Sequence, residues 1–240
     1  MINNQDEELR YYAKQSPTTE PGDLGYLFEK VSDRPEEISE TVYGLVTHRD
    51  ETEKFYNFAL PKEREDEPNT RFVRKILDKL IEIDSSPLTK NRDPKKRFIG
   101  TCRDFAILAC SIFRSKGAPA RLRCGFADYF VPGWYDDHWV CEYWDNNCGQ
   151  WKLLDAEIGP VERDYFKIEF DQTNISREKF LVGGRAWQAC RAGKINPDTM
   201  GVANIPHVKG LWFVRADVIR DLAALNKIEL LPWDFTEHFD

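Results

Sequence analysis

The hydrophobic positions of the first half of the chain follow a helical period in three segments. Over residues 35–46 the apolar side chains recur mostly at steps of three and four, with Pro35 in the first turn. Between residues 70 and 83 an apolar stripe lies opposite a polar, solvent-exposed face, which predicts an amphipathic helix. Residues 102–116 are apolar over a wide surface and end at Gly117, so we expect a helix inside the protein, packed against a sheet.

A period of two replaces the helical period after this third segment. Residues 120–126 alternate between apolar and polar side chains and predict a strand. Residues 138–144 and 151–155 predict two more strands, joined by the turn-forming residues 145–149. In such a hairpin the residues that enter the first strand pair with those that leave the second. We therefore expect positions 138 and 155 to meet.

The pattern is weaker in the last third of the chain. It predicts a helix over 184–191, a strand over 210–214, a helix over 216–226 and an extended piece over 227–233. No repeat, low-complexity segment or linker divides the sequence, so we expect one domain over residues 1–240. Its polar, proline-interrupted residues 1–23 are expected to form a loosely held arm.

Composition and charge exclude several classes of protein. The 240 residues are 41% hydrophobic and carry a formal net charge of -7, which argues against a general nucleic-acid binder. No apolar run approaches the roughly 18 residues of a membrane span. The first residues lack the basic start and apolar core of a signal peptide, so we expect a cytoplasmic protein without a membrane partner. The basic residues 90–97 predict a solvated loop, with an anionic-substrate patch as the alternative.

The spacing of cysteines and histidines predicts no metal and no cofactor. No Cys-x-x-Cys pair occurs, and the histidines lack the close spacing of a zinc site. In a reducing compartment most of the thiols should be free and packed as small apolar groups. The residues concerned are Cys102, Cys110, Cys124, Cys141, Cys148, Cys190, His48, His138, His207 and His238.

A cysteine, a histidine and an aspartate occupy the positions of a nucleophilic site. Cys102 starts the central helix, where unpaired N–H groups and the helix dipole favour a thiolate, and its own N–H could face an oxyanion. His138, at the start of a strand, can take the thiol proton and hold a thiolate–imidazolium pair. Asp155, at the end of the next strand, can fix the histidine tautomer. These three are the candidate catalytic residues.

Each of the three residues also has a structural interpretation. A cysteine at a helix start is commonly a small buried side chain. A histidine at a strand start is commonly a hydrogen-bonded structural residue, and an aspartate can cap a turn. The combination, a cysteine on a helix followed by a histidine and an aspartate across one hairpin, favours the catalytic interpretation.

Aromatic residues gather just before His138 and could wall or cover a site. The candidate substrate-binding residues are Trp134, Tyr129, Trp139 and Arg103. The alternative for each aromatic residue is a place in the core or on the surface.

Three motifs together resemble the transglutaminase-like superfamily, a branch of the papain-like cysteine enzymes. They are Gly-Thr-Cys102-Arg-Asp-Phe-Ala, His138-Trp-Val-Cys-Glu-Tyr-Trp and Trp151-Lys-Leu-Leu-Asp155. The resemblance covers about residues 70–160, with residues 161–240 as a C-terminal extension of the same domain. It implies an α+β fold in which a central helix bearing the cysteine packs on an antiparallel sheet. It also implies Cys102 as nucleophile, His138 as general base and acid, and Asp155 as the orienting carboxylate.

The resemblance leaves the substrate open. Members include cross-linking enzymes, peptidases, peptide N-glycanases and amide-forming enzymes, and some have lost activity. The chain has no room for the extra β domains of animal transglutaminases and lacks the paired cysteines of peptide N-glycanases. We therefore expect a peptide, a protein or a small amide or thioester as substrate.

Of the possible reactions we favour hydrolysis, as in a cysteine protease or amidase, over acyltransferase chemistry, because water is always available and the sequence shows no amine pocket. The main alternative is a catalytically idle peptide- or protein-binding module. A redox thiol protein would need a second cysteine near Cys102, and Cys110 lies about 12 Å further along the helix. The sequence does not indicate an oligomeric state.

Overall fold

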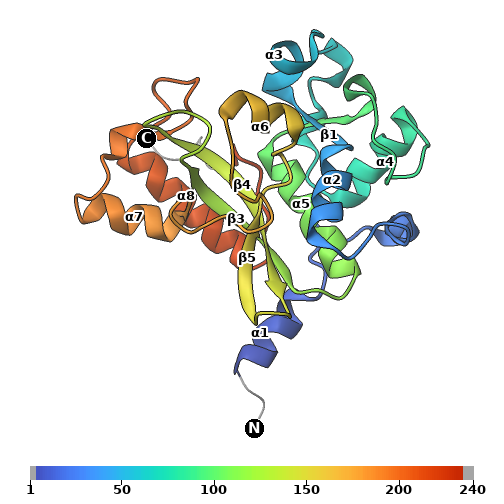
Figure 1. Ribbon diagram of the computed structural model, residues 1–240, viewed down its shortest axis with the longest axis horizontal. Helices are drawn as coiled ribbons and strands as arrows, with labels where there is room; N and C mark the ends of the chain where they lie inside the picture. The colour runs from blue at the N-terminus through green and yellow to red at the C-terminus, as the bar shows by residue number, and fades with distance from the viewer. Residues whose placement is uncertain (1–3, 235–240) are drawn as a thin grey trace.

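A curled sheet of five strands lies between two groups of helices in the computed structural model, which describes residues 4–234 (Figure 1). The strand order is β5-β4-β3-β6 with antiparallel neighbours, and β7 pairs in parallel with β4. These strands are β3 (Ala120–Ala127), β4 (Tyr135–Asp145), β5 (Gln150–Leu154), β6 (Phe180–Val182) and β7 (Met200–Gly201). The expected α+β architecture is confirmed. Residues 1–3 and His238 lie outside the described part.

Helices cover both faces of this sheet. One group centres on α5, which packs against β3 and β4, and the other on α8, which packs with α7 against β3 (Figure 1). The helices are α1 (Asn4–Tyr12), α2 (Pro35–Tyr43), α3 (Thr52–Tyr56), α4 (Val73–Ile83), α5 (Cys102–Ser115), α6 (Pro160–Phe166), α7 (Gly183–Arg191) and α8 (Leu211–Leu225). Short 3-10 helices span Gly22–Phe28, Arg49–Glu51, Lys62–Arg64, Glu67–Asn69, Pro94–Lys96 and Pro197–Thr199. Over residues 4–234 none of the helices combines the length and apolar character needed to cross a bilayer.

The central helix and the hairpin behind it follow the sequence pattern closely. Every residue of α5 from Arg103 to Arg114 is buried, as its wide apolar surface predicts. In β4, Trp139, Cys141 and Tyr143 join the hydrophobic cluster around α5, whereas Val140 joins a second cluster. Because successive strand residues point to opposite faces, this split confirms the predicted alternation.

Two predicted elements are wrong at their ends. Val46 does not continue the helix that ends at Tyr43; it starts β1 (Val46–His48), which pairs in parallel with β2 (Phe98–Gly100). Residues 210–214 do not form a strand, because α8 already begins at Leu211. Their aromatic and β-branched side chains favour a strand locally. Packing of this segment against β3 and α7 stabilises the helical conformation instead.

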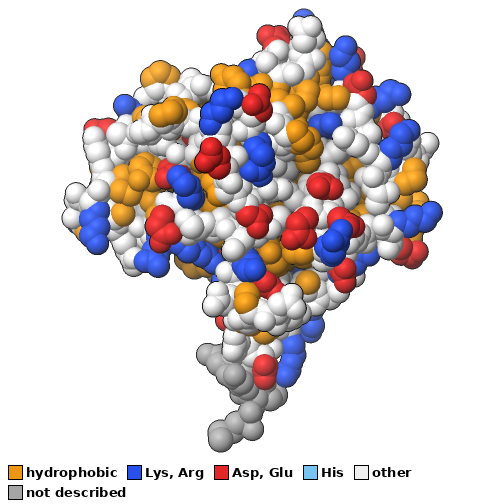
Figure 2. All heavy atoms as spheres, viewed as in Figure 1, with side chains coloured by type: hydrophobic (Ala, Val, Ile, Leu, Met, Phe, Trp, Pro, Cys, Tyr) orange, Lys and Arg blue, Asp and Glu red, His pale blue; other side chains and the backbone are white. Residues whose placement is uncertain are grey.

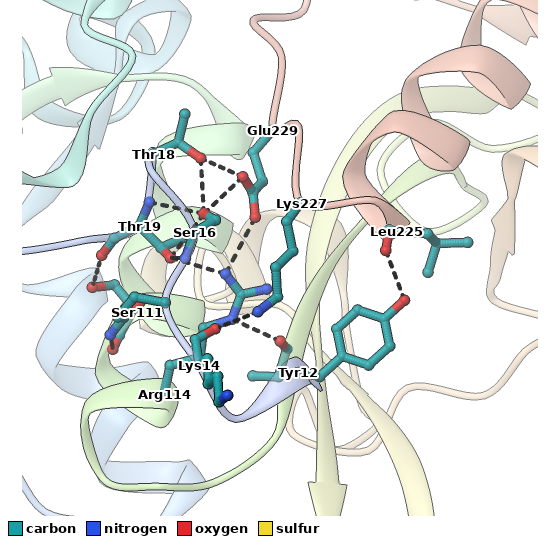
Figure 3. Close-up of polar contacts among 12 residues, drawn as sticks. Tyr12, Lys14, Ser16, Thr18, Thr19, Ser111, Arg114, Leu225, Lys227 and Glu229 are labelled. Carbon is teal, nitrogen blue, oxygen red and sulfur yellow. Dashed lines mark hydrogen bonds and ion pairs between the residues drawn. The ribbon is translucent and has the colours of Figure 1, made fainter. Parts of the chain in front are cut away.

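The N-terminal arm is bound to the domain, contrary to the sequence-based expectation. Figure 3 shows the contacts, which join the arm to α5 and to the segment after α8. The Tyr12 hydroxyl donates to the carbonyl of Leu225 at 2.8 Å, and the Ser111 hydroxyl donates to the carbonyl of Thr19 at 2.6 Å. Every residue has a backbone carbonyl, so hydrogen bonds to these acceptors cannot be predicted from the sequence pattern. The prediction of a loosely held arm depended on its polar composition alone and is wrong.

Glu229 is the centre of this contact network. It is 2% exposed and accepts hydrogen bonds from the hydroxyls of Ser16 and Thr18 (Figure 3). Its other oxygen lies 3.2 Å from Nη1 of the fully buried Arg114, which also donates to the Thr19 hydroxyl. A buried ion pair with all of these partners fixes residues 16–19 of the arm and the segment after α8 against α5.

Replacing Glu229 by glutamine is expected to lower the free energy of unfolding by roughly 3 kcal/mol, because it leaves a buried guanidinium without its counter-charge. Chemical denaturation measures the change. The exposed Glu29→Gln is the matched control and should stay within about 0.5 kcal/mol of the parent protein. Equal stability of the two variants would show that the ion pair does not hold the arm.

The basic residues 90–97 are only in part the solvated loop that we expected. Arg92 and Arg97 are 3% and 4% exposed. Arg92 Nη1 donates to the carbonyl of Leu80 at 2.7 Å, and Arg97 Nε donates to the carbonyl of Arg92 at 3.0 Å. These two arginines therefore hold the loop, and the lysines of the segment provide its exposed charge.

Acidic and basic side chains are interspersed over the face of the molecule that Figure 2 shows. Blue and red groups alternate there, with orange apolar groups between them. This face therefore offers no continuous area of one charge.

Candidate active site

Cys102 is the first residue of α5, and the start of this helix is tightly fixed. The backbone N–H of Thr101 donates to Oδ2 of Asp104 at 2.8 Å, and Asp104 pairs with the fully buried Arg103 at 3.2 Å. The contact between the Asp104 carboxylate and the Thr101 N–H is one half of a capping box. Because the first N–H groups of a helix have no partner within the helix, the thiol stands beside hydrogen-bond donors on a rigid support.

The hairpin of β4 and β5 brings His138 and Asp155 together, as the sequence predicts. Cys141 of β4 pairs with Leu154, the last residue of β5. Asp155 follows Leu154 and therefore lies beside the residues of β4 that precede Cys141, among them His138. His138 Nε2 and Asp155 Oδ2 are 2.8 Å apart, and both side chains are buried. This contact leaves Nδ1 as the second ring nitrogen of His138.

Asp155 is held at both of its oxygens. The hydroxyl of Tyr129 donates to Oδ2 at 2.8 Å, and the backbone N–H of Glu157 donates to Oδ1 at 3.0 Å. Two donors from neighbouring segments therefore fix the plane of the carboxylate. A fixed carboxylate in turn fixes the orientation of the His138 ring.

The thiol, the imidazole and an additional carboxylate converge at one point. Sγ of Cys102, a ring nitrogen of His138 and a carboxylate oxygen of Glu157 all lie within 4.8 Å of one another. The structure therefore places the three predicted residues in one cluster and adds Glu157, to which the sequence analysis gave no role.

The electrostatics of Cys102 differ from the sequence-based expectation. Burial raises the pKa of its thiol well above the ordinary value, and the carboxylates of Glu157 and Asp137 raise it further. A backbone hydrogen bond from Trp139 acts in the opposite direction and is weaker. The expected resting thiolate is therefore wrong: desolvation and negative neighbours outweigh the helix terminus, and the thiol is protonated at neutral pH.

A cavity of about 370 Å³ opens onto the cluster. Cys102, His138 and Glu157 line it together with segments that the sequence analysis left without a role. These segments are residues 48–51 and 54, 130–131, 136–137, 166, 202–205, 208, 213 and 232–233. The extension beyond residue 160 therefore completes the walls of the site.

Two further titratable residues of the cavity have strongly shifted pKa values. Burial and the negative charge of Glu162 raise the pKa of Glu51 to about 8. Burial lowers the pKa of His48 to about 4, although Asp50 acts against this shift. At neutral pH the cavity thus contains a neutral His48 ring and a carboxyl group that holds its proton.

Two of the four predicted substrate contacts are structural. Arg103 is fully buried and donates to the carbonyls of Leu230 at 2.9 Å and Arg71 at 2.8 Å, so it ties the start of α5 to the chain around it. Trp139 is 1% exposed and packs in the cluster around α5. Neither side chain reaches the cavity, and both predictions are wrong for the same reason: these residues fill the core beneath the site.

Neither of the other two predicted contacts, Tyr129 and Trp134, lines the cavity around Cys102. Tyr129 supports Asp155 and lines a neighbouring cavity of about 900 Å³, which shares Phe130 and Phe166 with the first cavity. The indole N–H of Trp134 donates to the carbonyl of Gly201 at 3.1 Å. Among the described residues Trp134 is not part of the wall around Cys102, so its main contact fixes β7 beside β4.

Burial and the negative charge of Glu51 raise the pKa of Glu157 well above its ordinary value, so this carboxyl group ionises only at higher pH, where its charge disfavours the Cys102 thiolate. Glu157→Gln removes that charge, so the pKa of the thiol should fall and alkylation by iodoacetamide should accelerate above neutral pH. The rate between pH 6 and 10, followed by peptide mass, gives the midpoint in both proteins. The exposed Cys148 of the same molecules is the control. A midpoint for Cys102 that stays or moves to higher pH would contradict this account.

The sequence contains a signal for Glu157, but none for most of the cavity wall. Glu157 lies two residues after Asp155, in the turn that follows β5, and its backbone N–H binds the Asp155 carboxylate, so it stays close to the site once Asp155 is assigned. His48 ends β1, and Glu51 follows shortly after it; β1 belongs to a two-stranded parallel sheet that no local pattern predicts. The wall from residues 202–208 depends on how the last third of the chain packs.

Residues 57–156 match the model of the Transglutaminase-like superfamily, and this segment contains the three predicted catalytic residues. No curated protein matches the chain. Among solved structures the chain is similar to a putative cysteine protease from Cytophaga hutchinsonii, with 16% sequence identity and a TM-score of 0.45. The similarity covers 75% of this chain and 46% of the other, so the chain spans about half the length of that protein.

Proposed function

From the match of residues 57–156 to the model of the Transglutaminase-like superfamily we propose that the protein is a cysteine-dependent acyl-transfer enzyme acting on an amide or thioester. The observation that carries the proposal is the place of His138, hydrogen-bonded to Asp155 through Nε2 and within 4.8 Å of the Cys102 thiol. A nucleophile, a base and a residue that orients the base, in this order, are the requirements of covalent catalysis.

The reaction starts from a neutral thiol. His138, with its proton on Nε2 facing Asp155, accepts the thiol proton at Nδ1 while Sγ of Cys102 attacks the carbonyl carbon. The backbone N–H of Cys102 stabilises the negative oxygen of the tetrahedral intermediate. His138 then returns the proton to the leaving amine or thiol, and the acyl group remains on Cys102 as a thioester.

Resolution of the thioester follows the same steps in reverse. A water molecule or an amine gives its proton to His138 as it attacks the thioester, and the proton returns to Sγ. We favour water, and therefore hydrolysis of the protease or amidase kind, because it needs no further binding site. The cavity of about 370 Å³ supports either acceptor, since it is large enough for a small side chain beside the thiol.

Turnover of a panel of amide and thioester donors tests the proposal. Peptides, small amides and acyl thioesters are incubated with the protein, with and without a primary amine, and the products are identified by mass. We expect a free acid as the main product, with amide formation as the alternative outcome of the same chemistry. Cys102→Ala should abolish turnover, and the matched Cys148→Ala, at an exposed position, should retain it. Full turnover by Cys102→Ala would refute the mechanism.

A binding module without catalysis is the second candidate function. The observation that favours it is the raised pKa of the Cys102 thiol, which lowers the fraction of reactive thiolate. In that case the donor panel gives no product in any variant, while a peptide still binds to the cavity with a measurable Kd. Catalytic turnover that depends on Cys102 excludes this candidate.

A further inference from the structure

Glu157 is a buried carboxylate without a full set of partners. It is 6% exposed, and within the part of the chain that the structure describes no hydrogen-bond donor reaches its Oε2. Burying an ionised carboxylate without partners costs free energy, so such a group is paired with a cation, coordinates one or holds a proton, as the free Glu157 does. Glu157 lines the cavity of Cys102 and is therefore open to a ligand from this side.

The neighbours of Glu157 complete a set of metal ligands. A thiol sulfur, an imidazole nitrogen and a carboxylate oxygen meet within 4.8 Å. Tetrahedral zinc with ordinary bond lengths separates such ligand atoms by roughly 3.3 to 3.6 Å, so small side-chain rotations are enough to close the site. The three residues are far apart in sequence, which is why the spacing of cysteines and histidines gave no sign of them.

The donor types and charges select the class of metal. Sulfur and nitrogen ligands favour zinc and exclude magnesium and calcium, which prefer oxygen. A thiolate and a carboxylate carry two negative charges, which a divalent cation balances within a half-buried site.

The hydrogen bonds behind His138 fit a metal ligand. Zinc-bound histidines usually donate their second ring N–H to a carboxylate, which orients the ring. Asp155 accepts from Nε2 at 2.8 Å and is itself held by Tyr129, so Nδ1 is left for the metal.

From this geometry we propose that Cys102, His138 and Glu157 form a reversible zinc site that blocks the thiol. Binding replaces the S–H bond of Cys102 by an S–Zn bond and the O–H bond of Glu157 by an O–Zn bond; both protons leave to solvent, and no electron is transferred. The occupied state protects Cys102 from alkylation. It also inhibits turnover, and this second consequence rests on the proposed function.

Zinc titration of the full chain tests the site without an activity assay. The protein is first freed of metal with a chelator. Calorimetry should then show one saturable site and proton release on binding, so that the measured heat differs between buffers of different ionisation enthalpy. Zinc should slow alkylation of Cys102 by iodoacetamide and leave the exposed Cys148 unchanged. Magnesium at the same concentration should protect neither thiol. Cobalt(II) should give a thiolate-to-cobalt charge-transfer band that Cys102→Ser abolishes.

Two matched variants separate ligation from the general negative charge of the cavity. Glu157→Gln removes a ligand oxygen and should weaken zinc binding by at least about tenfold, since loss of even an outer-sphere partner costs roughly 10–100-fold. Glu51→Gln changes another buried carboxyl group of the same cavity, outside the ligand set, and should bind zinc almost as tightly as the parent protein.

The proposal is overturned if zinc fails to protect Cys102 in the parent protein, or if Glu157→Gln binds zinc as tightly as the parent does. Protection of Cys102 in a protein that shows no turnover would support the zinc site and count against the proposed function alone. Turnover in a protein whose Cys102 is not protected by zinc would support the proposed function and count against the zinc site alone.

Discussion

Replacing Asp155 by asparagine is expected to reduce kcat/KM by about 10⁴-fold, as loss of the orienting carboxylate does in a comparable triad. Oδ1 of residue 155 accepts the N–H of Glu157, so the amide NH2 group would take the place of Oδ2 and face His138. The amide would then donate to Nε2 and force the ring proton onto Nδ1. The nitrogen that must accept the thiol proton would no longer be a base.

Steady-state kinetics with the best donor of the panel measures this effect. Asp128→Asn is the matched control, because Asp128 pairs with Lys179 at 3.4 Å outside the triad and should keep nearly full activity. Thermal unfolding of both variants shows whether the fold is retained. Activity of a folded Asp155→Asn protein within a few fold of the parent would mean that Asp155 does not orient the base.

Replacing His138 by alanine is expected to lower kcat/KM by about 10²–10⁴-fold, the usual contribution of a general base and acid. The loss should be larger at low pH than at high pH, because hydroxide can deprotonate the thiol once its raised pKa is approached. Added imidazole should restore part of the activity, since His138 lines the cavity and its removal leaves room there for the free ring.

The exposed His207→Ala provides the matched control for this variant and should leave activity and pH dependence unchanged. Rescue by imidazole should be confined to His138→Ala. If imidazole restored nothing and the pH profile matched that of the parent protein, proton transfer by His138 would be excluded.

The sequence carries much of the site because its residues lie in strongly patterned elements. The apolar surface of α5 places Cys102 at the start of a helix, and the hairpin geometry brings His138 to Asp155. The charge state of the thiol could not be derived in the same way. It depends on burial and on Glu157 and Asp137, whose positions follow from the packing of whole segments rather than from a local period.

The parts of the fold that escaped the sequence analysis are those set by long-range contacts. The strands β1 and β2 have only three residues each, too few to show a period, and they pair across about fifty positions of the chain. The start of α8 is helical although its first residues favour a strand, because it packs on β3 and α7. Arm residues 12–19 are held largely by backbone acceptors and by one buried ion pair centred on Glu229.

The buried carboxyl groups change the expected behaviour of the site. A protein with a resting thiolate would react with alkylating agents at low pH, whereas this one should need higher pH or a bound substrate. A substrate carbonyl beside Sγ lets His138 remove the proton only as the new bond forms. The neutral thiol is therefore compatible with catalysis and with slow reaction toward reagents that do not occupy the cavity.

Trapping of the acyl-enzyme tests the central claim most directly. The protein is mixed with a reactive acyl thioester, quenched in acid within the first turnover and examined by intact mass and peptide mapping. The account predicts one acyl group, on Cys102 alone, that disappears on treatment with hydroxylamine, forms much more slowly in His138→Ala and does not form in Cys102→Ala. Acylation spread over several cysteines, or of equal extent in Cys102→Ala, would contradict the assignment of Cys102 as the nucleophile.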